Sequence, residues 1–177
     1  MAITRLGGAN AITGTIPNSV LAAGNVIQVV QSVKTDTSST TSTSAVDISG
    51  LSASITPSSA SNKILILVQI GTAGQSNFNS RVHFVLSGGN TSTYIGDTSS
   101  SGNRVAMTIC PRGSTDGQYA QIPGKITYLD SPSTTSATTY KVQFFVSGNT
   151  GYINRPGTED ANTGLTASSI TVMEIAG

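Results

Sequence analysis

The sequence predicts an all-β protein: an antiparallel β-sandwich of jelly-roll-like form, preceded by an extended N-terminal arm. Apolar and polar residues alternate in several runs, as they do in strands with one buried face. The composition agrees, because 26 Ser, 25 Thr and 19 Gly among 177 residues suit strands joined by polar turns. No stretch keeps the helical period, and the strand-like runs recur every roughly 8 to 18 residues, which favours a sandwich.

Length and charge narrow the classes of function. A chain of 177 residues has the size of one domain. Its net charge of +1 and scattered basic residues supply no field for nucleic acid, and no apolar run is long enough for membrane insertion. The single cysteine, Cys110, excludes an internal disulfide. Gly and Pro interrupt the N-terminal apolar residues, so we predict no signal peptide.

Residues 1–25 follow neither the strand period nor the helical period, because their apolar residues are spaced irregularly among Gly, Asn and Pro. The segment is either a disordered tail or an arm that becomes ordered when its apolar residues pack on a partner. On the second interpretation, residues 1–25 anchor the protein and residues 26–177 form the sandwich domain. The anchoring residues would be Ile3, Leu6, Ile12, Ile16 and Val20.

The first half of the domain is predicted to contain strands at 26–33, 46–55, 63–70 and 81–87. Residues 35–44 are a Ser/Thr run and residues 71–80 are rich in Gly and Asn, so both are predicted to be loops. Within 46–55 the apolar phase shifts by one residue beside Gly50, which indicates a bulge or a corner between two sheets. The second half adds short strands at 93–95, 104–110, 118–122 and 152–153, and a final strand at 168–175.

Residues 125–147 contain the clearest pair of strands. Ile126 and Tyr128 share one face of the first, and Lys141 and Gln143 oppose four apolar residues on the second. The turn signal at 130–133 and the Ser/Thr run after it predict an exposed loop. We therefore expect two long antiparallel strands that supply most of the aromatic core. The predicted core includes Ile66, Val68, Phe84, Met107, Tyr140, Val142 and Phe144.

Few residues suggest catalysis or ligand binding, and we predict no catalytic residue, no metal site and no cofactor. His83, the single histidine, has no second His or Cys at metal-ligand spacing, and it faces away from Val82 and Phe84. Cys110 is either a thiol activated by a nearby cation or a small residue at a strand end. Asp160 and Asn162 resemble part of a calcium loop, but the full pattern is missing. Exposed tyrosines near loops are candidate saccharide platforms: Tyr94, Tyr119 and Tyr152.

Some apolar residues are not explained by a single core. Phe145 faces outward if Phe144 faces inward, and Met173 and Ile175 lie on the face of their strand opposite Ile170 and Val172. A strand that is apolar on both faces is normally covered on both. A neighbouring subunit or a loop at 35–44 is the expected cover. We therefore predict a homotrimer with Phe145, Met173 and Ile175 in its interface.

Five stretches of the chain are distinctive as phrases: M-A-I-T-R-L-G-G-A-N-A-I-T-G-T-I-P at the start, residues 35–68, residues 128–143, Y-I-N-R and S-S-I-T-V-M-E-I-A. They resemble stretches of short fibre-type virion proteins of tailed bacteriophages of aquatic bacteria such as cyanobacteria. The resemblance implies a trimeric structural protein of the virion, with a β-sandwich body that contacts other virion proteins. It also implies attachment to host surface polysaccharide or protein. A capsid decoration (cement) protein is the alternative, and a polysaccharide-degrading domain is the third possibility.

Overall fold

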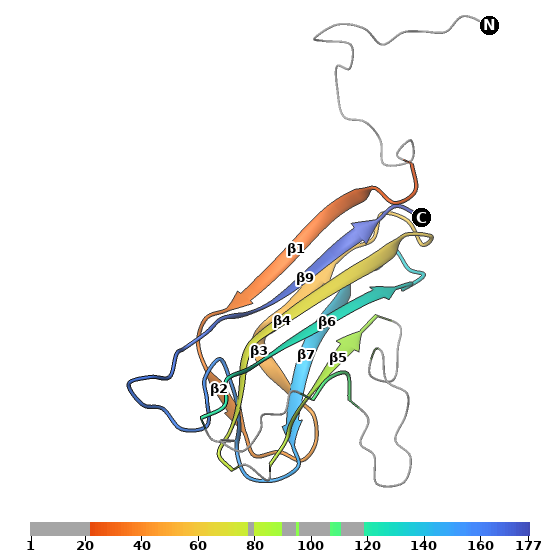
Figure 1. Ribbon diagram of the computed structural model, residues 1–177. Coiled ribbons are helices and arrows are strands. Elements are labelled where there is room, and N and C mark those ends of the chain that lie inside the picture. Colours follow the sequence, from red (N-terminus) through yellow and green to blue (C-terminus); the bar gives the residue numbers. More distant parts are fainter. Residues whose placement is uncertain (1–21, 78–79, 90–94, 96–106, 111–118) are drawn as a thin grey trace, which may run out of the picture.

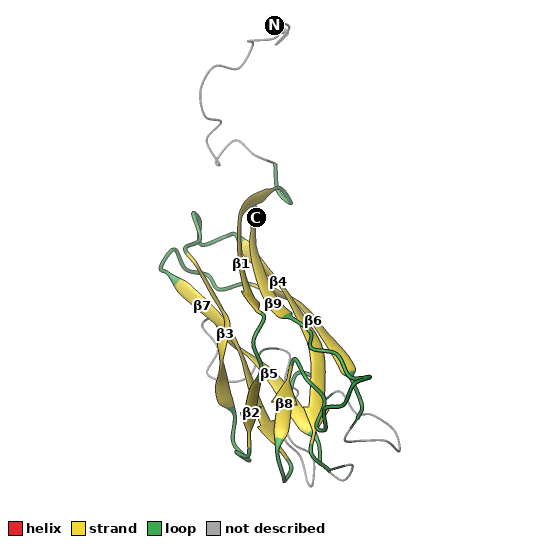
Figure 2. Cartoon of the chain, turned by 90° about the vertical axis from the view of Figure 1, so that its left-hand side faces the viewer, coloured by secondary structure: helices red, strands yellow, loops and turns green. Residues whose placement is uncertain are grey.

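The computed structural model of the chain describes residues 22–77, 80–89, 95, 107–110 and 119–177. Across these residues it has nine strands and no helix, and the strands form two antiparallel sheets packed face to face (Figures 1 and 2). The predicted all-β sandwich is therefore confirmed. Residues 1–21, which include all five anchoring residues, lie outside the described residues. The part described contains no helix that could cross a membrane.

The larger sheet, called the large sheet below, has four long strands side by side. In spatial order they are β1 (Val26–Lys34), β9 (Ser168–Ile175), β4 (Lys63–Gln75) and β6 (Ile122–Asp130). Two short strands extend it at one end. The last residues of β4 pair with β8 (Gly151–Ile153), which in turn pairs with β2 (Ser38–Thr40).

The small sheet contains β3 (Val46–Ile55), β7 (Thr138–Val146) and β5 (Val82–Gly88), in that order. Single bridges join β5 to Ile95 and Ile109. From β2 to β8, successive strands alternate between the two sheets. Strands that are neighbours in sequence therefore lie in different layers along most of the chain.

The core fills the space between the two sheets with alternate residues from each strand. A fully buried aliphatic side chain contributes roughly 1.5–3 kcal/mol to folding, and more than a dozen such side chains lie here. Six of the seven predicted core residues are buried in this cluster: Ile66, Val68, Phe84, Tyr140, Val142 and Phe144. Met107 is the exception. It is only half-buried, and its sulfur lies 3.2 Å from Nδ1 of His83.

The two strands predicted at 125–147 exist, as β6 and β7, but they do not pair with each other. β6 pairs with β4 in the large sheet, whereas β7 lies between β3 and β5 in the small sheet. The loop between them must therefore cross the ~10 Å that separates packed sheets. The Tyr140 hydroxyl, on β7, donates a 2.6 Å hydrogen bond to Asp130 at the end of β6 and so ties the two sheets together. Tyr128 is 37% exposed, because β6 lies at an edge.

The predicted loop at 71–80 is partly wrong, because β4 continues to Gln75. The glycines in this stretch allow close approach and do not make a turn. A Cβ on Gly71 would clash with the carbonyl oxygen of Ala167, and one on Gly74 would clash with that of Arg155. The predicted loop at 35–44 likewise contains the short strand β2. The irregularity expected beside Gly50 is confirmed as a register shift between Asp47 and Ser52.

One end of the sandwich contains a buried carboxylate, that of Glu174 on β9, which is 0% exposed. It accepts hydrogen bonds from Gln28 Nε2 at 2.5 Å, Asn62 Nδ2 at 2.5 Å, and the backbone N and side-chain Oγ of Ser58 at 2.6 and 2.8 Å. Among the described residues no cation pairs with it. Burial alone would raise the pKa of this carboxyl, but the donors outweigh burial and hold the pKa below its ordinary value of 4.5.

We predict that Glu174 makes the free energy of unfolding fall as the pH is lowered in the acidic range. Because its pKa is lower in the folded protein than in the unfolded chain, its contribution is complete above about pH 4.5 and is lost as the pH falls through the folded value. Glu174→Gln should lower the free energy of unfolding at pH 7 by about 1–3 kcal/mol, since an amide cannot accept all four hydrogen bonds. The loss below about pH 4.5 should be smaller in this variant than in the wild type.

Urea unfolding at pH 7 and at several pH values below 5 measures both effects. Glu159→Gln is the matched control, because Glu159 is half-exposed and contacts only Arg155 among the ion pairs of the described residues. If both variants lost the same free energy of unfolding at pH 7, the result would contradict this role of Glu174.

Candidate interaction surface on the large sheet

The outer faces of the two sheets differ in chemistry. On the small sheet, the residues of β3 and β7 that point away from the core are mostly polar. Lys141 Nζ lies 2.9 Å from Asp47 Oδ2, and Gln143 Nε2 donates to the other oxygen of the same carboxylate at 2.5 Å. This ion pair and hydrogen bond lower the pKa of Asp47. The hydroxyl groups of Ser54 and Thr139 are hydrogen-bonded at 2.7 Å. Five outward polar side chains of β3 and β7 therefore pair with one another.

Phe145 also points outward from the small sheet, as predicted, but the single chain already covers it. It is 5% exposed and stacks on His83, with ring centroids 4.6 Å apart. His83 is buried too, and its contact with Met107 lies on the same side. Burial, with a smaller effect from Arg81, lowers the pKa of His83, so the ring is neutral near pH 7. Phe145 is therefore buried within the single chain, without a neighbouring subunit.

The four long strands of the large sheet align their outward residues in three rows, called row one, row two and row three. Row one is Val29, Met173, Leu65 and Leu129; row two is Gln31, Thr171, Leu67 and Thr127; row three is Val33, Ser169, Gln69 and Lys125. None of these twelve residues is acidic. The face therefore changes from apolar at one end to polar and cationic at the other.

Row one, called the apolar band below, crosses all four strands. Val29 is 55% exposed and Leu129 is 51% exposed, while Leu65 and Met173 are half-buried. Ile175, also half-buried, follows Met173 on the same face of β9. Nothing in the described part of the chain covers the band. A contiguous apolar patch on a sheet face is typical of a surface that contacts another molecule.

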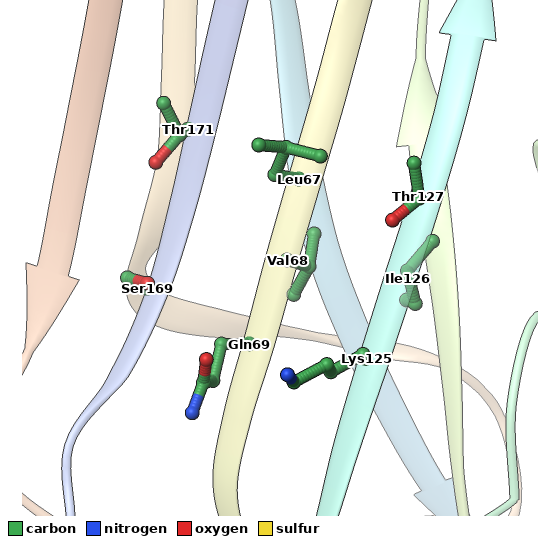
Figure 3. A pocket seen from close by; sticks show the side chains of 8 residues that line it. All are labelled: Leu67, Val68, Gln69, Lys125, Ile126, Thr127, Ser169 and Thr171. Atoms are coloured by element: carbon green, nitrogen blue, oxygen red, sulfur yellow. The ribbon is translucent and has the colours of Figure 1, made fainter.

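Rows two and three enclose a shallow hollow of about 330 Å³ over β9, β4 and β6. Figure 3 shows the lining side chains: six point outward, and Val68 and Ile126 lie behind them. The six are Thr171 and Ser169 from β9, Leu67 and Gln69 from β4, and Thr127 and Lys125 from β6. The hollow forms because short hydroxyl side chains stand between the longer ones of Leu67, Gln69 and Lys125.

The structure separates the three predicted interface residues. Met173 and Ile175 lie on the outer face of the large sheet, whereas Phe145 lies on the opposite side of the sandwich. One flat interface cannot include all three. The sequence did not single out Val29, Leu65, Leu129 or Lys125. The signal for Leu65 was present, because the run I-L-I-L-V at 64–68 is apolar on both faces of its strand.

The other residues considered for catalysis, metal binding or sugar binding do not come together in one site. Asp160 accepts a hydrogen bond from the backbone of Asn162, and Glu159 pairs with Arg155. The Arg155 guanidinium lies 4.5 Å from the ring centroid of Tyr152, which leaves that ring half-buried. Tyr119 is exposed and Cys110 is half-buried, while Tyr94 lies outside the described residues. Within the described ranges, no three His, Cys, Asp or Glu side chains gather as a metal site requires.

The fold and this surface define an all-β sandwich with one polar outer face and one partly apolar outer face. A scan against protein-family models and a search of curated proteins found no match to the chain. The sequence phrases and the arrangement of the surface are therefore the features that bear on function.

We predict that Phe145→Glu destabilises the fold of the single chain. Placing a carboxylate at this covered position should lower the free energy of unfolding by about 3–5 kcal/mol. Thr139→Glu is the control, since Thr139 is exposed on the same face of the same strand, and it should cost less than about 1 kcal/mol. Chemical denaturation measures both values. A Phe145→Glu protein as stable as the wild type, but changed in mass, would place Phe145 at a contact between subunits.

Proposed function

We propose that this chain is a non-enzymatic structural protein of a bacteriophage particle, of the fibre type. The N-terminal arm attaches it to the particle, three copies associate through the large sheet, and the sandwich projects to contact the surface of the host cell. The proposal is supported by the phrases shared with fibre-type virion proteins and by the sandwich fold that those phrases imply. The observation that carries it is the position of the apolar band relative to the arm.

The arm enters the sandwich at the end where the apolar band lies. Gly24 N donates to the carbonyl oxygen of Ala176 at 2.8 Å, and Ala176 N donates to that of Asn25 at 2.8 Å. The chain therefore joins β1 directly beside the end of β9, next to Ile175 and Met173. The loops at 41–45 and 147–150 lie at the opposite end (Figure 1). The molecule thus has an attachment end and a polar end that is free to project.

The same arrangement suits a capsid decoration protein, in which the arm and the apolar band would clamp neighbouring capsid subunits. The position of the apolar band beside the arm favours this second candidate as much as the first. The copy number separates the two, because a decoration protein covers the head whereas fibres are few. Quantitative mass spectrometry of purified particles gives the copy number per particle.

We predict that the arm is required for assembly into the particle but not for folding. A chain lacking residues 1–21 keeps Gly24 and Asn25, whose hydrogen bonds belong to the sandwich, and should retain its β-sheet spectrum. It should be missing from particles produced in a complementation experiment. A full-length protein in which the five anchoring residues, Ile3, Leu6, Ile12, Ile16 and Val20, are replaced by Ser should behave alike. Normal incorporation of either protein would contradict the anchoring role.

We also predict that the apolar band holds the copies together. The full chain should have about three times the single-chain mass of 18.0 kDa in light scattering. Val29→Glu combined with Met173→Glu should reduce the mass to that of one chain without loss of the β-sheet spectrum. The control, Ser52→Glu with Ser54→Glu on the outer face of the small sheet, should leave the mass unchanged. A wild type that is monomeric at micromolar concentration would contradict the trimer.

A further inference from the structure

The hollow on the large sheet contains a cation that has no partner in the described part of the chain. Lys125 is exposed on β6, and no hydrogen bond or ion pair holds its ammonium group there. The other lysines facing outward differ, because Lys141 pairs with Asp47 and Lys63 donates to Ser131 Oγ at 3.3 Å. Rows one to three contain no carboxylate that could reach Lys125. An anionic group from another molecule would therefore meet no repulsion here.

The rest of the lining offers neutral hydrogen-bonding groups around one apolar side chain. The Gln69 amide and the hydroxyl groups of Ser169 and Thr127 make no hydrogen bond within the described residues, so they are available to a ligand. Leu67, on the central of the three strands that line the hollow, supplies the apolar contact (Figure 3). Donors, acceptors, one aliphatic surface and one cation thus lie on three adjacent strands.

These features match one class of small molecule. A sugar ring has hydroxyl groups that both donate and accept, together with a face of C–H groups that packs on an aliphatic side chain. A uronic acid adds one carboxylate, which an ammonium group binds. The volume of about 330 Å³ is at the lower limit for ligand sites, so it suits one or two sugar units more than a larger molecule.

We infer that this hollow is a binding site for an acidic saccharide, with Lys125 on the carboxylate, Leu67 under the sugar ring, and Gln69, Thr127 and Ser169 on its hydroxyl groups. The inference rests on the proposed function, because it names the kind of host-surface polysaccharide that the projecting sandwich would contact. The site uses rows two and three and none of the residues of the apolar band. Binding here and association through the band can therefore be separated by substitution.

The site is open, and one exposed ion pair contributes little, so each site binds weakly. Three copies in one trimer, and several trimers on one particle, would raise the apparent affinity without any further contact. A sugar without a carboxylate loses only the contact with Lys125. We expect it to bind about threefold to fivefold more weakly.

The test is a titration of the isotope-labelled full-length protein with digalacturonate, followed by the NMR shifts of its backbone amides. The neutral galactose disaccharide of the same linkage and a sulfated galactose disaccharide are the matched sugars, and an Asp-Glu dipeptide represents a protein ligand. Lys125→Gln is the test variant. Lys63→Gln is its control, because Lys63 is on the same sheet but outside the hollow.

We expect digalacturonate to shift the backbone amide signals of residues 67–69, 125–127 and 169–171 alone. The dissociation constant should be on the order of millimolar and should rise with salt. Lys125→Gln should weaken digalacturonate binding by about threefold to fivefold and bring it to the level of the neutral sugar, while Lys63→Gln should not. Tighter binding of the sulfated sugar than of digalacturonate would support the site with sulfate as the anion. No saturable shift, equal binding of the neutral sugar, or preference for the dipeptide would overturn the inference. Presence of the protein in purified particles, measured by mass spectrometry, tests the proposed function independently of this result.

Discussion

The buried carboxylate of Glu174 stabilises the end of the sandwich at which the apolar band lies. A charged group that is fully removed from water must receive hydrogen bonds on both oxygens, and here the donors come from β1 and from the segment between β3 and β4. Asn62 uses its other amide atom to accept from Gly177. These bonds fix the positions of β1 and β9 relative to each other. As a result, Val29 and Met173 lie in one row, and the arm leaves the sandwich beside them.

The two outer faces explain why one surface is a candidate for contact and the other is not. On the small sheet, five outward polar side chains of β3 and β7 pair with one another, and Phe145 stacks on His83. The large sheet leaves an apolar row across four strands, and two rows away lies Lys125, whose ammonium group has no partner among the described residues. Apolar area favours association with a protein surface, while a partnerless cation among hydroxyl groups favours a polar anionic ligand. One face thus supplies both proposed contacts.

Much of the fold could be predicted from period-two alternation, because each long strand has one face in the core. The strand at 168–175 was predicted with its observed bounds, and most of the predicted core residues are buried. The pairing of strands could not be predicted, because the alternation of apolar and polar residues in β7 is the same whether β7 lies beside β6 or in the other sheet. The length of β4 was underestimated, since Gly71 and Gly74 resemble turn residues although they admit neighbouring backbone. The candidate surface was found in part, through Met173 and Ile175. Its other members depend on register between strands distant in sequence, which composition and periodicity do not determine.

If the copies associate as proposed, the apolar band on the outer face of the large sheet is covered when the protein is assembled, while rows two and three stay open. Hydroxyl-radical footprinting measures this directly, because Met173 lies in the apolar band and methionine sulfur is readily oxidised. The measurement compares oxidation of Met173 in intact particles, in the purified full chain, and in a Val29→Glu chain at a concentration where light scattering gives the mass of one chain. We expect strong protection of Met173 in the first two samples relative to the third. Equal oxidation of Met173 in all three samples would show that the apolar band stays open to water and would contradict association through the band.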